Sequence, residues 1–188
     1  GYQVKTYHCP DDRAATITRF AEAAEQCDVV ISTGGVSVGE EDHVRAAVDT
    51  LGHIDAWKVR MKPGKPFAFG QLLDKHFFGL PGNPVAAFTT FHLFVLPTLA
   101  RLQGQTYLMP HAMPVIANFS FRSGDRRDYL RAKLLYQAQG LPVEIYPNPA
   151  SSALVSASWA DGFVVVTEHQ EVQIGDTVRF IPFSDFMQ

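Results

Sequence analysis

Residues 28–42 constrain the fold of this chain more than any other stretch, because they place a short apolar run before a glycine-containing loop and a charged segment. The run from Val29 to Ile31 is β-branched and does not alternate with polar residues, which is typical of a strand inside a parallel sheet. Glycines between a strand and a helix let backbone amides face an anion. The stretch therefore predicts an α/β fold with an anion-binding loop, and a purely structural turn stays open as the alternative.

The first part of the chain alternates predicted strands with predicted helices. Asp11 or Asp12 is a candidate N-cap for the first helix, while Asn83 as N-cap and Pro84 in the first turn mark the start of a long one. This alternation predicts an α/β domain over residues 1–108, with a three-layer, mostly parallel sheet. Helices are expected at about 13–27, 41–51 and 84–102, and strands at about 29–32, 67–70 and 76–80.

The second part contains only extended runs separated by turn sequences. We therefore expect a small all-β domain over residues 109–188. Its strands are expected at about 115–121, 129–139, 143–146, 162–167 and 177–183.

Two strand–loop–helix junctions, at residues 33–42 and 79–84, are expected to emerge at the same carboxyl edge of the sheet, where ligands bind in open α/β folds. Glycine amides can approach a phosphate or another oxyanion closely, and hydroxyl groups add donors. Neither the G-x-G-x-x-G pattern of dinucleotide-binding loops nor a P-loop is present. The candidate anion-binding residues are Thr33, Gly34, Gly35, Ser37, Gly39 and Gly82.

Basic residues lie in the stretch between these junctions. If residues 56–62 are extended, Lys58, Arg60 and Lys62 fall on one face, and a turn follows before Lys65. Beside the glycine loops, such a row predicts binding of an anion with several phosphate or oxo groups. A solvated edge strand protected by its lysines is the alternative.

Carboxylates stand at the expected starts of two helices, with Asp42 before the second and Asp11 or Asp12 before the first. Such residues cap free amides and favour the helix dipole without any further role. Beside a phosphate pocket they can also hold Mg²⁺, which takes one or two carboxylates together with waters and phosphates. The sequence leaves both interpretations open.

Charge and composition exclude several classes of function. The formal net charge of -3 gives no electrostatic case for nucleic acid. Only Cys9 and Cys27 occur, without a C-x-x-C pair, so we expect no disulfide framework or zinc site, and a reducing cytoplasm. Polar residues interrupt the apolar stretch 85–102, which favours a buried helix over a membrane span. Four arginines, at positions 122, 126, 127 and 131, suggest either a solvated turn or a ligand or subunit contact.

Three ordered motifs, STGGVSVGEED at 32–42, WKVRMKPGKP at 57–66 and GLPGNP at 79–84, resemble the MoeA-type molybdopterin molybdenumtransferases, whose eukaryotic relative is the gephyrin E domain. The resemblance covers essentially the whole chain. It implies most of a molybdopterin-binding domain of the MogA and MoaB fold, lacking its first strand, followed by the family's C-terminal β domain.

The resemblance implies a Mg²⁺-dependent reaction that inserts molybdate into adenylylated molybdopterin and releases AMP. The family's functional acids match Asp11 and Asp42, with Asp42 as the expected metal ligand. The expected catalytic residues are Asp11, Asp42, Lys58 and Lys62, and the expected substrate-binding residues beside the glycine loop are Lys65, Pro81, Gly82, Asn83 and Pro84. Preference for molybdate or tungstate is not readable from the sequence.

Further expectations come from the family. Its members work as homodimers, and a MogA-like adenylyltransferase is an expected partner. They carry two more domains and a Thr-Gly-Asp-Glu-Leu segment before the matching part, so we expect this chain to be a fragment that binds ligand weakly and lacks turnover alone. The alternatives are a non-catalytic scaffolding module in the manner of gephyrin, a MogA-like molybdopterin adenylyltransferase and a CinA-like nucleotide hydrolase.

Overall fold

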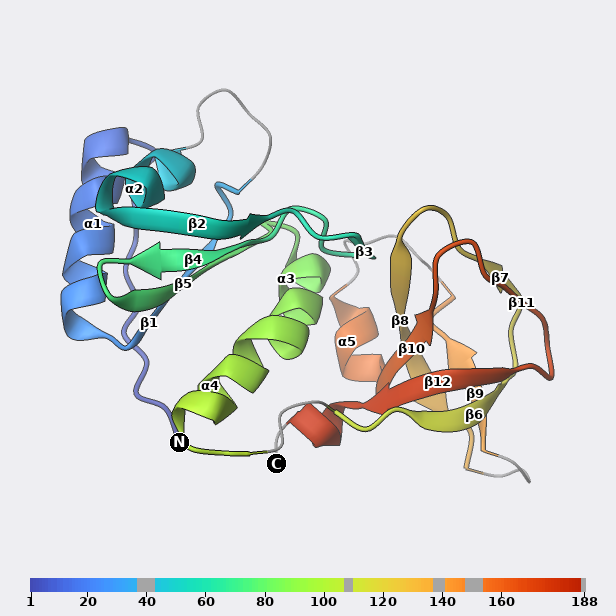
Figure 1. Cartoon of the computed structure of the whole chain (residues 1–188). Coiled ribbons are helices and arrows are strands. Elements are labelled where there is room, and N and C mark those ends of the chain that lie inside the picture. The colour runs from blue at the N-terminus through green and yellow to red at the C-terminus, as the bar shows by residue number, and fades with distance from the viewer. Residues whose placement is uncertain (37–42, 107–109, 137–140, 148–153, 187–188) are drawn as a thin grey trace. The chain divides into compact units, whose positions relative to one another are not determined.

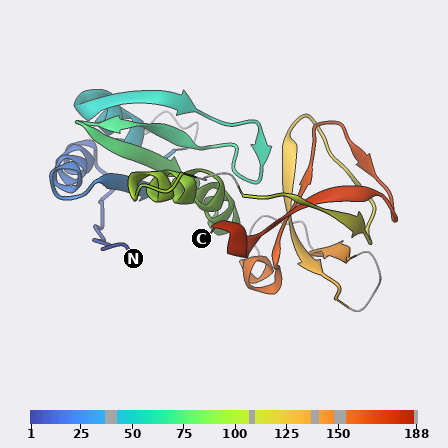
Figure 2. The same ribbon diagram turned by 60° about the horizontal axis from the view of Figure 1, so that its bottom comes forward.

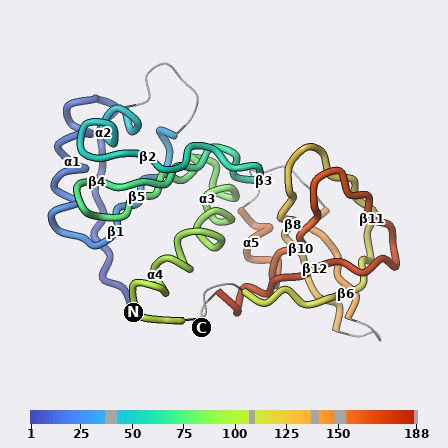
Figure 3. The backbone as a smooth tube through the Cα atoms, viewed as in Figure 1, coloured from blue at the N-terminus to red at the C-terminus, as the bar shows by residue number. Residues whose placement is uncertain are grey.

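The chain forms two units, each with a core of its own (Figure 1). The structure is a computed structural model that describes residues 1–36, 43–106, 110–136, 141–147 and 154–186. The first unit contains residues 1–59 and 66–82, and the second contains residues 60–65 and 83–188. The backbone therefore passes from one unit to the other after Val59, Lys65 and Gly82 (Figure 3).

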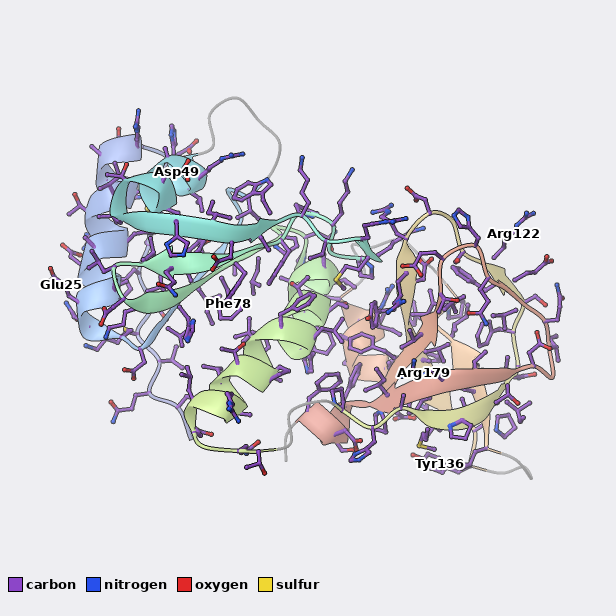
Figure 4. All side chains as sticks on the ribbon, viewed as in Figure 1. Glu25, Asp49, Phe78, Arg122, Tyr136 and Arg179 are labelled. Atoms are coloured by element: carbon purple, nitrogen blue, oxygen red, sulfur yellow. The ribbon has the colours of Figure 1, made fainter. Side chains whose placement is uncertain are left out.

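Two helices and four strands build the first unit. The helices are α1 (Arg13–Gln26) and α2 (His43–Leu51), and the strands are β1 (Val29–Thr33), β2 (Gly52–Trp57), β4 (Ala68–Leu72) and β5 (Lys75–Leu80). Helix α1 begins where Asp12 accepts a hydrogen bond from the amide of Ala15 at 2.8 Å. Glu25 on α1 and Asp49 on α2 are exposed (Figure 4), whereas the opposite faces of both helices pack on the sheet.

The sheet of the first unit is mixed, in the order β1-β5-β4-β2. Strand β1 pairs with β5 in parallel, but β4 pairs antiparallel with both of its neighbours. The expectation of a mostly parallel sheet is therefore wrong for these four strands. The physical reason is that only Leu73 and Asp74 separate β4 from β5, and so short a connection forms a hairpin rather than a parallel crossover.

The core of the first unit lies between the two helices and one face of the sheet. Phe20 of α1 packs on Phe77 of β5 with ring centroids 5.6 Å apart. Small residues of the helices, such as Ala24 and Ala47, are buried with them and allow close approach to the strands. The buried cluster consists of Phe20, Ala23, Ala24, Val30, Val36, Ala47, Val48, Ala68, Leu72 and Phe77.

A long helical segment starts at Pro84, as expected, but it belongs to the second compact unit and not to the first, where the sequence placed it. It comprises α3 (Pro84–Thr90), the π-helical turn η1 (Phe91–Val95) and α4 (Leu96–Leu102). Pro97 has no amide hydrogen and its ring crowds the preceding turn, which disfavours α-helical hydrogen bonds across that turn. The π-helical turn ends at Val95, and Pro97 lies in the first turn of α4.

By length and composition the helix Pro84–Leu102 is apolar enough to cross a membrane. Its apolar side chains nevertheless have partners in the second unit. Phe88 lies 5.3 Å from Phe183 and 6.2 Å from Phe163, measured between ring centroids. Residues of α3 such as Val85 and Ala86 are buried, whereas no residue of α4 is buried.

Five strands of the second unit close into a barrel (Figure 2). They are β6 (Met113–Ala117), β8 (Arg127–Leu134), β9 (Pro142–Ile145), β10 (Gly162–Val166) and β12 (Thr177–Pro182). The order is β10-β12-β6-β9-β8, and β8 pairs with β10 to complete the ring. Alternate residues of β8, including Leu130, Ala132 and Leu134, fill the barrel together with Val164 and Phe180.

Smaller elements complete the second unit. They are β3 (Met61–Lys62), β7 (Phe121–Arg122), β11 (Glu171–Val172), the short helix α5 (Val155–Trp159) and the 3-10 turn η2 (Phe183–Phe186). Strand β3 pairs in parallel with β8, and β7 pairs with β11. The expected all-β character is thus correct for the strands, while α5 was not expected.

Candidate functional site

The carboxyl ends of β1 and β5 lie side by side. Thr33 and Leu80 are register partners in the parallel pair, and the amide of Gly34 donates to the carbonyl of Leu80 at 3.0 Å. Because the strands run in the same direction, the loops that follow them leave the same edge of the sheet. The sequence predicts this meeting of the two loops.

The glycine loop turns through backbone conformations that favour glycine. Gly34 and Gly35 have φ values of 84° and 68°. A Cβ on Gly35 would lie 2.5 Å from Cγ2 of Val44, whereas a Cβ on Gly34 would meet no described residue within 4 Å. A Cβ on Gly82 would lie 3.6 Å from the Cα of Gly34, so the two loops approach each other through backbone. Because the Gly34 amide is engaged by the Leu80 carbonyl, the amides of Gly35 and Gly82 are the candidate anion donors among these three glycines.

Three residues of the predicted loop, Ser37, Gly39 and Asp42, lie outside the described residues. Val36, the last described residue of this segment, is 2% exposed and would collide with a Cβ on Gly79 of β5. The packing of Val36 therefore fixes the base of the loop.

Asp11 and Asp12 have separate roles. Asp12 is the N-cap of α1, and its carboxylate is engaged by the amide of Ala15. The Asp11 side chain is fully exposed, and its Oδ1 lies 3.6 Å from Nε2 of His43. His43 is the first residue of α2, so Asp11 lies beside the start of the helix that the glycine loop enters.

Lys58 follows β2 in the first unit with a φ of 73°, which is unusual for a residue with a side chain. Its amide donates to the carbonyl of Phe67 at 2.8 Å, which holds this conformation. Sterically unfavourable backbone conformations of this kind often occur at functional sites.

The expected row of Lys58, Arg60 and Lys62 on one strand is wrong. The left-handed turn at Lys58 ends the extended alternation, and residues 60–65 belong to the second unit. There Lys62 lies in β3, opposite Asp128 of β8, and Lys65 follows after a turn. Arg60 donates through Nη2 to the carbonyl of Asp125 at 3.1 Å. This hydrogen bond joins residues 60–65 to the turn before β8.

The second junction starts α3 as predicted. The Asn83 side chain accepts from the amides of Val85 and Ala86, each at 3.1 Å, and Pro84 occupies the first turn. Pro81 and Gly82 precede this cap at the end of β5. Asn83 thus has a structural role that is sufficient to explain its position.

One arginine of the predicted cluster differs from the others. Arg131 is 5% exposed, donates through Nε to Oγ of Ser156 at 3.0 Å, and has no carboxylate within 4.0 Å in the described part of the chain. Burial lowers the pKa of Arg131, and nearby Tyr146 opposes this change. A buried guanidinium without a carboxylate is suited to an oxyanion ligand. The sequence named this residue in the cluster but did not distinguish it.

Ser32 is a second residue that the sequence did not single out. Its Oγ is buried and has no hydrogen-bond partner within the described ranges. It lies one residue before the candidate Thr33, near the end of β1. The residue types around Ser32 do not indicate that its hydroxyl is buried, because this burial arises only when distant segments pack in the folded chain.

The predicted residues thus divide between the units. The first unit brings together Thr33, Gly34, Gly35, Pro81 and Gly82, and also contains Asp11 and Lys58; the second contains Lys62, Lys65, Asn83, Pro84 and Arg131. Within the described residues, no group of three or more histidine, cysteine, aspartate or glutamate side chains is arranged to hold a metal ion.

Comparison with known protein families identifies both parts of the chain. Residues 1–101 match the family described as "Probable molybdopterin binding domain". The chain belongs to this family. Residues 114–183, which include the barrel strands, match "MoeA C-terminal region (domain IV)", so that the two matches together confirm the resemblance to MoeA proteins.

Curated relatives of this MoeA-family chain agree. It is 38% identical over 183 residues to the molybdopterin molybdenumtransferase of Haemophilus influenzae, covering 95% of this chain and 45% of that protein. It is 39% identical over 156 residues to the molybdenum cofactor synthesis protein cinnamon of Drosophila melanogaster, covering 80% of this chain and 26% of that protein. The chain therefore spans less than half the length of these relatives.

Solved structures show the same fold. The MoeA protein of Pyrococcus horikoshii, described as a molybdopterin biosynthesis protein, aligns with a TM-score of 0.74 at 28% identity, over 92% of this chain and 41% of that one. A molybdenum cofactor biosynthesis protein of Pyrococcus furiosus aligns with a TM-score of 0.68 at 22% identity, over 92% of this chain and 55% of that one, and shows likeness of fold alone.

Proposed function

We propose that the protein to which this chain belongs inserts molybdate into adenylylated molybdopterin and releases AMP. The observation that carries this proposal is the parallel pairing of β1 and β5, which brings the glycine loop and the Gly82 turn to one edge of a sheet. The names of the relatives support the same reaction, and the match to the MoeA C-terminal region favours it over a MogA-like adenylyltransferase.

The described residues suggest a division of labour. The amides of Gly35 and Gly82 bind phosphate oxygens, because the two loops approach each other through backbone at Gly34 and Gly82. The ammonium groups of Lys58, Lys62 and Lys65 neutralise charge on the pyrophosphate and the molybdate. The Arg131 guanidinium binds an oxyanion, for which molybdate is the candidate. Positioning and charge neutralisation then supply most of the rate enhancement, and no protein nucleophile takes part.

Mg²⁺ is part of the proposal. Asp11 fits as a ligand because its carboxylate is exposed, is not the helix cap, and lies beside the start of α2. Asp42, the other expected ligand, lies outside the described residues. Mg²⁺ commonly uses one or two carboxylates together with substrate phosphates, so this small set of acids is compatible with it. The ion would neutralise phosphate oxygens during cleavage of the adenylate.

Further parts of the proposal rest on the family resemblance. They are a homodimer, a MogA-like adenylyltransferase as partner, a cytoplasmic location, three layers in the first part, and a domain boundary between residues 108 and 109. The limits of the two family matches, 101 and 114, support a boundary in this region. The compact units divide the chain differently, because residues 60–65 and the helix from Pro84 pack with the barrel.

The test is molybdate-dependent release of AMP from adenylylated molybdopterin by the complete protein. Lys62→Ala is expected to lower the rate by about a hundredfold, the scale of losing one charge that acts in the transition state. Lys75→Ala is the matched control, because Lys75 starts β5 at the other end of the strand and pairs with Asp74 at 3.1 Å. Equal rates for the two variants would contradict the lysine role, and no AMP release by the wild type would overturn the function.

A further inference from the structure

Asp128 is a buried carboxylate whose role the fold leaves open. It is the second residue of β8 and is 3% exposed. Leu130 and Ala132 follow at alternate positions and belong to the barrel core, so Asp128 stands on the same face at one end of the barrel. In the part of the chain that the structure describes, its carboxylate makes no hydrogen bond and no ion pair within 4.0 Å.

Lys62 is its neighbour on the adjacent strand. The two residues are register partners in the parallel pair of β3 and β8, and directly opposed side chains project from the same face of a sheet. Burial raises the pKa of Asp128, while attraction to Lys62 and then to Arg126 lowers it. The carboxylate and the ammonium group therefore interact through space.

Other cations near Asp128 have partners of their own. Arg127 lies 3.5 Å from Glu168, measured from Nη2 to Oε2, and Arg126 lies 3.7 Å from Asp125, measured from Nε to Oδ1. Lys62, in contrast, forms no ion pair within 4.0 Å with any described residue.

The remaining charged groups on the neighbouring elements have other contacts or are exposed. Arg60, just before β3, donates to the carbonyl of Asp125. Glu171 of β11 accepts from Nε2 of Gln173 at 2.9 Å, and Arg122 of β7 is exposed (Figure 4). Lys62 and Asp128 are thus two opposite charges on directly paired residues, each without an ion pair within 4.0 Å among the described residues.

The backbone around Lys62 is held by its neighbours, so the position from which the side chain projects is defined. Besides the pairing with β8, the amide of Arg127 donates to the carbonyl of Arg60 at 3.2 Å. A Cβ on Gly64 would lie 2.6 Å from Cγ2 of Thr90, so the turn after β3 packs tightly on α3. Because the backbone is held, the remaining conformational freedom is that of the long Lys62 side chain. A nearby opposite charge can restrict this side-chain freedom.

We propose that Asp128 is a positioning residue that holds the ammonium group of Lys62 in place for the anionic substrate. The inference rests on the proposed function, in which Lys62 binds the pyrophosphate or molybdate. A carboxylate fixed in the wall of the barrel restricts where the ammonium group lies and thereby reduces the entropy lost when it meets the transition state. Asp128 itself touches neither substrate nor metal.

The coupling can be tested without turnover. The ¹³C shift of the Asp128 carboxyl group is followed against pH in the 188-residue chain, in Lys62→Met and in the control Lys65→Met. Because Lys62 favours the charged carboxylate, its loss is expected to raise the pKa of Asp128. Lys65→Met is expected to leave it unchanged. An unchanged pKa of Asp128 in Lys62→Met overturns the proposal.

Activity provides the second test, in the complete protein. Asp128→Asn is expected to lower kcat for AMP release about tenfold without raising KM, because it removes positioning and not the cation that binds the substrate. Asp176→Asn is the control, a carboxylate of the same unit that accepts from the amide of Gln173. Wild-type kcat in Asp128→Asn overturns the proposal.

A pH profile separates positioning from a merely structural effect. As pH falls through the raised pKa of Asp128, the wild type loses the charge that holds Lys62, so kcat decreases. Asp128→Asn is expected to lack this acid limb, and a retained limb counts against the proposal. If the wild type releases no AMP, the proposed function fails, while the carboxyl titration still decides whether Lys62 and Asp128 are coupled.

Discussion

The amide of Gly34 donates to the carbonyl of Leu80 at 3.0 Å, and this bond joins the two loops on which the candidate site depends. It continues the parallel ladder of β1 and β5 one residue beyond Thr33, into the first left-handed glycine. The geometry of the glycine loop is therefore coupled to the end of β5.

Gly35 and Gly34 provide a matched pair for testing the loop. Gly35→Ala is expected to lower the free energy of unfolding by about 2–3 kcal/mol, because the new Cβ meets Val44 and φ is positive. Gly34→Ala is expected to have only the conformational cost, about 1 kcal/mol, since no described residue lies within 4 Å of its Cβ. Urea unfolding measures both, and equal losses would contradict the close packing against Val44.

Lys58 is expected to show a trade between stability and function. Lys58→Gly relieves the unfavourable φ of 73° and is expected to raise the free energy of unfolding by up to about 1 kcal/mol. Lys58→Ala keeps that φ and is expected to give no such gain. Both variants remove the cation, so both should lose AMP release by a similar factor. A less stable glycine variant would show that the strain is absent.

The adjacent acids Asp11 and Asp12 are expected to separate into a functional and a structural residue. Asp12→Ala removes the cap of α1 and should lower the free energy of unfolding by about 1 kcal/mol. Asp11→Asn should leave unfolding unchanged, since the Asp11 side chain is fully exposed, and should raise the Mg²⁺ concentration needed for half-maximal AMP release. A loss of stability in Asp11→Asn together with a higher Mg²⁺ requirement in Asp12→Ala would show that Asp11 is the structural residue and Asp12 the functional one.

His92 makes stability depend on pH in a predictable direction. Burial among aromatic rings lowers the pKa of His92 from its ordinary value near 6.5, and its Nδ1 contact with the Phe88 carbonyl at 2.8 Å opposes part of this. The unfolded chain thus binds a proton at a higher pH than the folded chain, so stability falls as pH drops below about 6.5.

The measurement is the urea midpoint at pH 7 and at pH 5. His92→Phe should lose much of the difference between the two midpoints, because it removes the titrating group and keeps the ring contacts with Phe163 and Phe183. His169→Asn is the control, since His169 is exposed and asparagine tolerates its φ of 59°. If His92→Phe retained the full pH dependence, another group would be responsible.

Local sequence signals predicted helices and strands correctly where neighbouring residues, such as a helix cap or an apolar run, determine the element. The cap formed by Asn83 and Pro84 starts α3 as expected, and the apolar run after Asp28 forms β1. The prediction of one cationic strand through Lys58, Arg60 and Lys62 is wrong, because alternation assumes an extended backbone and Lys58 is left-handed. The hydrogen bond from the Lys58 amide to the Phe67 carbonyl holds this turn. It joins the residue after β2 to the residue before β4, and a contact between two separate segments leaves no trace in the local periodicity of the sequence.

The sequence by itself determined the strand–glycine loop–helix junction, the capped long helix, the second part rich in strands and the family, because each depends on residue types at short, fixed spacing. Only the tertiary structure decided that β4 and β5 form a hairpin within a mixed sheet, that Lys62 lies opposite Asp128, and that Arg131 is buried without a carboxylate. These features arise from strand pairing and burial between distant segments, and the free energy of such contacts depends on neighbours that no local pattern specifies.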